Sequence, residues 1–185
     1  MSNAAVIDAG ELRERVSVLT LKDKGSEYVW EESRRSWAKA ELNTRKNIWS
    51  VHGIGATGVT FVMRCSSLCL DNALKWRGQH CFISSIIPYG RGHVKVEAAL
   101  VEPVQCEDKY KSLTFPALMT EEWHKHEQLE PHAINTLSHV LVTPKCIELK
   151  PGKLVTVAGD AWPIKTAHTL DPHKNEYIIE RTVDL

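Results

Sequence analysis

The sequence predicts a mainly β protein in which two small β-barrels or meanders follow one another. Three observations favour this fold class. Short segments rich in Val, Ile, Leu and aromatic residues recur along the chain, turns rich in Gly, Pro and Asp separate them, and two strand-rich stretches are similar to each other. With 185 residues, of which 43% are hydrophobic and 25% are charged, the chain can bury a sizeable core.

The first strand-rich stretch opens with a segment of period-two alternation. Val16 and Val18 alternate with Arg15 and Ser17, which is typical of a strand with one buried face. Further segments of high strand propensity follow, and Gly78 and the run Pro88–Gly92 supply two of the turns between them. The segments that we expect to be strands are 12–21, 28–30, 36–42, 59–63, 74–76, 81–87 and 94–101.

Residues 106–139 differ in composition from the strands before them. They hold many Glu, Lys and His residues, and Thr120, followed by Glu121 and Glu122, could open a short helix as its N-cap. Strands are expected again at 140–142, 154–157, 162–165 and 176–180. We therefore divide the chain into a first β-barrel (1–105), a mixed connector (106–139) and a second, repeat-like β meander (140–185).

The two strand-rich stretches show an internal repeat with a spacing of 81 residues. At this spacing Gly78 aligns with Gly159, and the following positions also align: Cys65 with Cys146, Leu68 with Leu149, Leu74 with Val155, Trp76 with Val157 and Ile83 with Ile164. A two-residue insertion in the next turn then aligns Val94 and Val96 with Tyr177 and Ile179. Any two four-strand meanders share part of this spacing, but the joint agreement of glycines and apolar positions favours a duplication.

The chain has no net charge, because 23 basic residues balance 23 acidic ones. This balance excludes a strongly basic coat for nucleic acid and an acidic tail. The two parts of the chain differ, however. Residues 1–105 carry 14 Lys and Arg against 11 Asp and Glu, and residues 106–185 carry 9 against 12, a polarity that favours head-to-tail packing of copies.

The apolar segments and the cysteines indicate the compartment. No apolar run approaches the ~18 residues of a membrane span, and no charged-then-apolar segment indicates secretion. Five cysteines is an odd number, so we expect buried, unbridged thiols in a reducing compartment. These cysteines are Cys65, Cys69, Cys81, Cys106 and Cys146.

Five short motifs follow one another between residues 9 and 102: Gly10–Val16, Trp30, Ser36–Leu42, Val59–Val62, and Trp76–Gln79 with Phe82–Ile83. In this order they resemble the head–tail joining proteins of tailed bacteriophages, the head-completion or connector proteins of the neck. Residues 139–185 resemble them more faintly. Members of that family are usually single small β-barrels that form a ring. This chain departs from the pattern in carrying a second copy and in lacking a double glycine in the hairpin 25–30.

The resemblance implies a structural virion protein of the phage neck and no enzyme. Copies would form a homo-oligomeric ring, hexameric or dodecameric, which joins the DNA-filled head, through the portal or adaptor, to the tail proteins. Edge strands and loops of one subunit would pack on the next. The ring would pass or retain double-stranded DNA through transient, non-specific contacts, with no cofactor and no membrane. Its location would be the host cytoplasm during assembly and the neck of the virion afterwards.

Segment 43–58 is the candidate partner-binding element. It is polar and then Gly-rich, and at about 16 residues it is longer than connections in compact domains usually are. Large apolar side chains in such a loop suggest that a partner buries them. The candidate partner-binding residues are Arg45, Lys46, Ile48, Trp49 and His52. The other basic pair, Arg34 and Arg35, is interpreted as part of a solvated turn.

Two other functions are open on the sequence. His124 and His126 stand two residues apart, so on a strand they would share a face and could hold a metal together with a cysteine, as in a metal-dependent hydrolase. A solvated acidic linker explains them more simply. The second alternative is another phage tail component, such as a tail terminator or baseplate adaptor. We assign no catalytic residue and no metal ligand, since there is no Gly-x-Ser-x-Gly elbow and Cys65 and Cys69 lack the spacing of a zinc pair.

Overall fold

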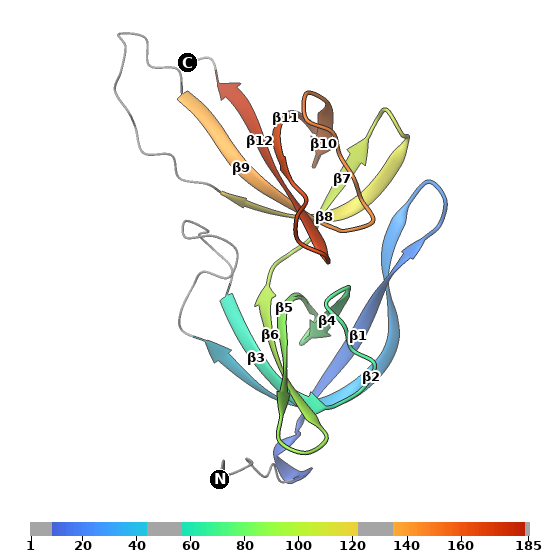
Figure 1. Ribbon diagram of the computed structural model, residues 1–185, viewed down its shortest axis with the longest axis vertical. Helices are drawn as coiled ribbons and strands as arrows, with labels where there is room; N and C mark the ends of the chain where they lie inside the picture. The colour runs from blue at the N-terminus through green and yellow to red at the C-terminus, as the bar shows by residue number, and fades with distance from the viewer. Residues whose placement is uncertain (1–8, 44–56, 122–134, 184–185) are drawn as a thin grey trace. The chain divides into compact units, whose positions relative to one another are not determined.

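The computed structural model of this chain describes residues 9–43, 57–121 and 135–183 (Figure 1). Within these ranges the protein is all-β apart from a short 3-10 turn, η1 (Ala9–Glu11), and its strands close into two six-stranded antiparallel barrels in tandem. The expected fold class is therefore confirmed. No helix in these ranges has the length and apolar character needed to cross a membrane.

The first barrel closes in the strand order β1-β2-β3-β6-β5-β4. Its strands are β1 (Glu14–Asp23), β2 (Tyr28–Asn43), β3 (Thr57–Arg64), β4 (Asn72–Trp76), β5 (Gln79–Tyr89) and β6 (His93–Leu100). Closure comes from the pairing of β1 with β4, which places Val16 opposite Trp76. Strand β2 is one long strand where we expected two, because the polar residues 31–35 continue the extended chain instead of forming a turn.

Period-two alternation builds the core of the first barrel. In β3, Val59, Phe61 and Met63 are fully buried, and Thr60 and Val62 between them are only partly covered. Phe61 packs edge-on against Trp76, with the ring centroids 5.7 Å apart. Burial of each such side chain stabilises the fold by about 1.5–3 kcal/mol relative to leaving it exposed.

The second barrel closes in the order β7-β8-β9-β12-β11-β10. Its strands are β7 (Val104–Asp108), β8 (Leu113–Glu121), β9 (Asn135–Pro144), β10 (Leu154–Val157), β11 (Asp160–His168) and β12 (Lys174–Val183). Its core includes Phe115, Leu141, Ile164 and Tyr177. The compact unit that holds this barrel comprises, within the described ranges, residues 103–121 and 135–183, together with residues 23–29.

The expected connector, 106–139, belongs largely to this second barrel. Residues 106–108 and 113–121 lie in β7 and β8, and Thr120 and Glu121 continue β8 instead of opening a helix. Composition misled the prediction, because the many Glu, Lys and His residues and Pro116 are not typical of a strand. Pro116 lies opposite Gln105 in β7, and the pairing of β8 with β9 begins only at Leu118, so no β9 hydrogen bond is needed from its missing N–H.

The two barrels have the same topology, strand for strand, and the expected repeat extends over all six strands. In β4–β5, Leu74 pairs with Cys81, and in β10–β11, Val155 pairs with Trp162. The hairpin turns match as well. Arg77 and Gly78 have φ of 50° and 85°, and Ala158 and Gly159 have 51° and 96°, the signature of a type I′ turn. The strands that follow these turns, β5 and β11, each have one shift in ladder register. It lies between Ile83 and Ser85 in β5 and between Ile164 and Thr166 in β11.

The predicted alignment of the last strand was wrong by two residues. Val96 pairs with Ile86, and Tyr177 pairs with Ala167, so Val96 corresponds to Tyr177 and the spacing of 81 continues without the insertion. A shift of two residues keeps the same face of a strand buried. Hydrophobic pattern alone therefore could not distinguish the two alignments, and the ladder register decides between them.

Candidate functional site

The partner-binding residues predicted from the sequence lie outside the described residues. These are Arg45, Lys46, Ile48, Trp49 and His52. At the ends of the 43–58 segment, Asn43 pairs with Gly58, so both residues are parts of the β2–β3 ladder. His124 and His126, which carried the metal-site alternative, also lie outside the described residues. Within the described ranges, no three His, Cys, Asp or Glu side chains come together in a way that could hold a metal ion.

The five cysteines are described, and none of them forms a disulfide. Cys81 and Cys106 are buried, as expected, and burial raises the pKa of each thiol to about 12. Cys65, Cys69 and Cys146 are exposed, so the expectation that all the thiols are buried was wrong for these three. They lie in the loops that follow β3 and β9, and in the second of these loops the buried positions are taken by Ile147 and Leu149, on either side of the exposed Glu148.

A hollow of about 690 Å³ lies on the outer surface of the first barrel. It is lined by Gly10, Leu12, Arg13, Arg35, Ser36, Trp37 and Arg64. Three guanidinium groups and one indole thus share one surface. These residues come from the segment that leads into β1, from the middle of β2 and from the end of β3, three neighbouring parts of the barrel (Figure 1).

Strand geometry explains why these side chains meet. Ala38 is fully buried in the barrel, so Trp37 beside it points outward and is 56% exposed. The guanidinium of Arg15, on β1, lies over the Trp37 ring, 5.9 Å from its centroid. On the other side, Ala38 pairs with Met63, and the same register continued by one residue places Trp37 beside Arg64.

The outward row continues across the next two strands. Arg64 pairs with His93 on β6, and His93 pairs with Tyr89 on β5. Two arginines and three aromatic rings therefore lie side by side across five strands of the barrel. We call Arg15, Trp37, Arg64, His93 and Tyr89, together with Arg13 and Arg35 in the hollow, the cation–aromatic face.

Most of the positive charge on this face is not neutralised. Arg35 Nε donates to Glu32 at 2.6 Å, and hydrogen bonds from Ser17 and Arg35 lower the pKa of Glu32, so that pair is ionised. Arg13 Nε donates to the Gly10 carbonyl at 2.7 Å, which leaves its other N–H donors available. Among the described residues, Arg13, Arg15 and Arg64 form no ion pair.

The second barrel provides a comparison within the same chain. By ladder register, the positions of Arg15, Trp37 and Arg64 correspond to Gln105, Pro116 and Pro144. Gln105 pairs with Pro116, just as Arg15 lies over Trp37, but the pair carries no charge and Pro116 is buried. The barrel fold therefore does not require cations or an aromatic ring at these positions, which makes the cation–aromatic face a candidate binding surface.

Arginine and tryptophan side by side suit a ligand with anionic groups and planar or apolar surfaces between them. A guanidinium binds phosphate or carboxylate through two parallel N–H donors. An exposed indole packs against sugars, bases or apolar side chains. Nucleic acid combines these two features at regular spacing, and an acidic protein surface combines them at irregular spacing.

Sequence reasoning missed this face because its members are far apart in the chain. The pair Arg34–Arg35 was assigned to a solvated turn, but both residues lie within β2. Arg34 donates to Ser66 and Ser67 in the loop after β3, whereas Arg35 faces the hollow. One feature of the sequence could have revealed the face. Arg35, Trp37 and Lys39 alternate with Ala38 in a strand, so the three side chains share the face opposite to that of the buried alanine.

Comparison of the chain with protein-family models, with curated proteins and with solved structures finds no match. A functional assignment therefore depends on the fold, on the cation–aromatic face and on the residues that resemble the head–tail joining proteins. The fold and the face belong to the described part of the chain and are open to direct mutation.

Proposed function

We propose that this chain is a structural protein of the neck of a tailed bacteriophage, where copies of it form a ring between the DNA-filled head and the tail. Two lines support the proposal. The ordered motifs in residues 9–102 resemble the head–tail joining family, and small β-barrels are the fold that this resemblance implied. The observation that carries most weight is the cation–aromatic face, which one barrel has and its repeat does not.

The assembly mechanism differs in one respect from the one expected from the sequence. Pairing between edge strands of neighbouring subunits requires an unpaired edge, and a closed barrel has none. Copies would therefore contact each other through the outer faces and loops of the barrels. A heterologous, head-to-tail contact of this kind closes into a ring when its rotation divides a full turn. The net positive charge of residues 1–105 and the net negative charge of the remainder favour that polarity.

Double-stranded DNA is the anionic ligand that fits a neck protein. Arg13, Arg15 and Arg64 would contact phosphates, and Trp37 would pack on the sugars between them. Three such charges per subunit give weak, salt-sensitive binding, because each phosphate contact contributes a slope of about −0.9 in log K against log salt. Weak contacts repeated around a ring hold DNA in the channel without fixing its position, which suits a polymer that must slide.

Imaging and sedimentation test the proposal. Purified protein is examined by negative-stain electron microscopy and by sedimentation velocity over a range of concentrations, with and without a 50-base-pair duplex. We expect closed rings with a central channel, and duplex that sediments with them at low salt. A protein that stays monomeric at all concentrations and does not retain duplex would overturn the proposal.

A second measurement separates the proposal from the metal-dependent hydrolase. Elemental analysis of the purified protein by plasma mass spectrometry reports bound metal directly. A stoichiometric transition metal, lost when His124 and His126 are both changed to Ala, would favour the hydrolase instead.

A further inference from the structure

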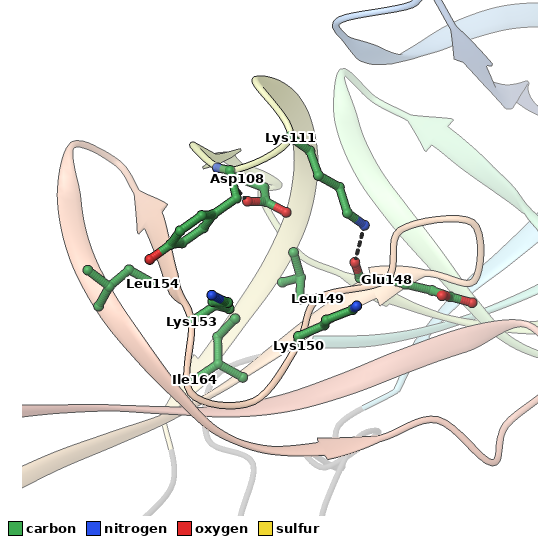
Figure 2. Close-up of a pocket in the computed structure, with 9 residues that line it drawn as sticks. Asp108, Lys111, Glu148, Leu149, Lys150, Lys153, Leu154 and Ile164 are labelled. Atoms are coloured by element: carbon green, nitrogen blue, oxygen red, sulfur yellow. Dashed lines mark hydrogen bonds between the residues drawn. The ribbon is translucent and has the colours of Figure 1, made fainter.

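A pocket on the second barrel has a chemistry different from that of the cation–aromatic face. It lies between the β7–β8 turn and the loop 145–153, which joins β9 to β10 (Figure 2). The residues that line it are Asp108, Tyr110, Lys111, Glu148, Leu149, Lys150, Lys153, Leu154 and Ile164. All of them belong to one compact unit, so the pocket does not depend on the placement of the other barrel.

The floor of this pocket is apolar. Leu149 and Ile164 are members of the barrel core and are only 6% and 1% exposed, while Leu154 at the margin is 48% exposed. The pocket volume is about 260 Å³. That is just below the roughly 300–1,000 Å³ of pockets that enclose a drug-sized ligand, and it suits one large side chain.

The rim of the pocket carries three ammonium groups. Lys111 Nζ donates to the carbonyl oxygen of Glu148 at 2.7 Å, which holds that lysine at the rim and leaves it further donors (Figure 2). Lys153 Nζ lies 4.5 Å from the centroid of the Tyr110 ring, which restrains the second lysine by a cation–π contact. Within the described chain, Lys111, Lys150 and Lys153 form no ion pair.

The acidic side chains of the pocket do not cancel this charge. Asp108 is only 7% exposed, and its Oδ1 accepts the Tyr110 backbone N–H at 3.0 Å, so this carboxylate stabilises the β7–β8 turn. Glu148 lines the pocket from the loop 145–153, and within the described chain its carboxylate forms no ion pair with Lys111, Lys150 or Lys153. The pocket therefore presents surplus positive charge above an apolar floor.

The first barrel lacks this pocket chemistry at the equivalent place. Ladder register matches Lys153 and Leu154 with Asn72 and Ala73, and Asn72 donates to the Leu19 carbonyl instead of facing solvent as a cation. The fold therefore does not require a cation at the position of Lys153.

We propose that this pocket binds a short segment of a partner protein in which an apolar side chain is flanked by carboxylates. The apolar side chain would cover Leu149 and Ile164, and the carboxylates would pair with Lys150 and Lys153. Charge complementarity and pocket size favour this ligand. A small anion alone would leave Leu149 and Ile164 exposed to water, and a neutral apolar side chain alone would leave the lysines without a carboxylate partner. The inference does not rest on the neck function or on DNA binding.

Nuclear magnetic resonance with the full chain tests the proposal. The probe is the capped tripeptide acetyl-Asp-Phe-Asp-amide, added at millimolar concentration to ¹⁵N- and methyl-labelled protein. We expect saturable shifts of the Leu149, Leu154 and Ile164 methyl signals. Acetyl-Asn-Phe-Asn-amide, which lacks the charge, and acetyl-Asp-Ser-Asp-amide, which lacks the apolar group, should each bind at least about fivefold more weakly.

Charge removal on the protein completes the test. The double variant Lys150→Met/Lys153→Met keeps the apolar stems and should weaken tripeptide binding at least about fivefold, whereas Lys109→Met, on the β7–β8 turn but outside the pocket lining, should not. Both variants are checked for unchanged spectra elsewhere in the barrel. Equal binding of the Asn and Asp tripeptides, or equal shifts produced by inorganic phosphate, would overturn the proposal. Loss of self-association in the double variant would also overturn it, in favour of a second copy of this chain as the occupant.

Discussion

Trp37 and Pro116 occupy the same position in the two barrels of this chain. Each directly precedes a buried alanine, Ala38 in β2 and Ala117 in β8. Because neighbouring side chains of a strand point to opposite faces, Trp37 and Pro116 both point away from the interior of their barrels. Trp37 is 56% exposed beside Arg15, and Pro116 is buried opposite Gln105. The same position thus holds an exposed indole in one barrel and a buried, uncharged proline in the other, so the second barrel serves as an internal reference for what the fold itself requires there.

The first prediction concerns DNA binding by the cation–aromatic face. Arg15→Ala/Arg64→Ala should weaken binding of a 50-base-pair duplex about tenfold or more at 0.1 M salt, and should reduce the slope of log K against log salt by about 2. The physical reason is the loss of two phosphate contacts per subunit. Fluorescence anisotropy at several salt concentrations measures both quantities.

The control for this prediction removes one positive charge elsewhere on the chain. Lys109→Ala lies on an exposed turn of the second barrel, so it should leave the salt slope and the affinity within about twofold of the parent. Melting temperatures of all variants should agree within about 2 °C, because Arg15 and Arg64 are exposed. If Lys109→Ala loses half or more of the log affinity that the double variant loses, binding follows overall charge and the face is not a DNA site.

The second prediction concerns the two equivalent hairpin turns. Gly78→Ala and Gly159→Ala should each cost about 1–2 kcal/mol, since φ is +85° and +96° and a Cβ at either site meets nothing within 4 Å, so the cost is backbone strain alone. For a chain of this size that is roughly 2–8 °C in Tm. Ala158→Gly, at φ 51°, should not lower the Tm. A loss at one glycine only would contradict the equivalence of the turns.

Local pattern was sufficient for much of the fold. Strand β10 was predicted at 154–157 and found at Leu154–Val157, because Leu-Val-Thr-Val stands between a Pro-Gly turn and an Ala-Gly turn. The repeat was recognisable for the same reason. Strands β7 and β8 were missed because their polar composition and Pro116 hid the alternation of Phe115 and Ala117 toward the core.

The candidate site could not be predicted in the same way. Arg15, Trp37 and Arg64 become neighbours only through the pairing of three strands, and a one-residue change of register would place them on different faces. The pocket of the second barrel is likewise lined by residues that are distant in sequence, from the turn after β7 and from the loop after β9. Sequence reasoning instead favoured segment 43–58, where Trp49 and Ile48 follow a basic pair within one short stretch of chain.

The third prediction concerns thiol reactivity. In the native protein Cys65, Cys69 and Cys146 should react readily with Ellman's reagent at pH 8, while Cys81 and Cys106 should react far more slowly, because burial raises the pKa of both to about 12. In denaturant without reductant, all five should titrate. Recovery of three thiols or fewer under denaturing conditions would reveal a disulfide and contradict the assignment.

The last prediction concerns pH and the buried imidazole of His80. Burial, together with the charge of Lys75 on the paired strand, lowers the pKa of His80 from 6.5 to about 4. His80 packs against Trp30, with the ring centroids 5.6 Å apart, and among the described residues its Nε2 is buried without a hydrogen-bond partner. The folded barrel therefore holds His80 neutral at pH values where the unfolded chain binds a proton.

This difference sets the direction of the pH effect. Because the folded pKa lies below the unfolded one, the contribution of His80 to stability is complete above pH 6.5 and is lost as the pH falls from 6.5 toward 4, by about 3 kcal/mol at most. His80→Phe should remove that part of the pH dependence, and His93→Gln, at a more exposed position, should retain it. Thermal melting from pH 7.5 to 4.0 measures the effect. A parent protein whose Tm is flat over this interval, or a His80→Phe variant that loses stability as steeply as the parent, would show that His80 is not the titrating group.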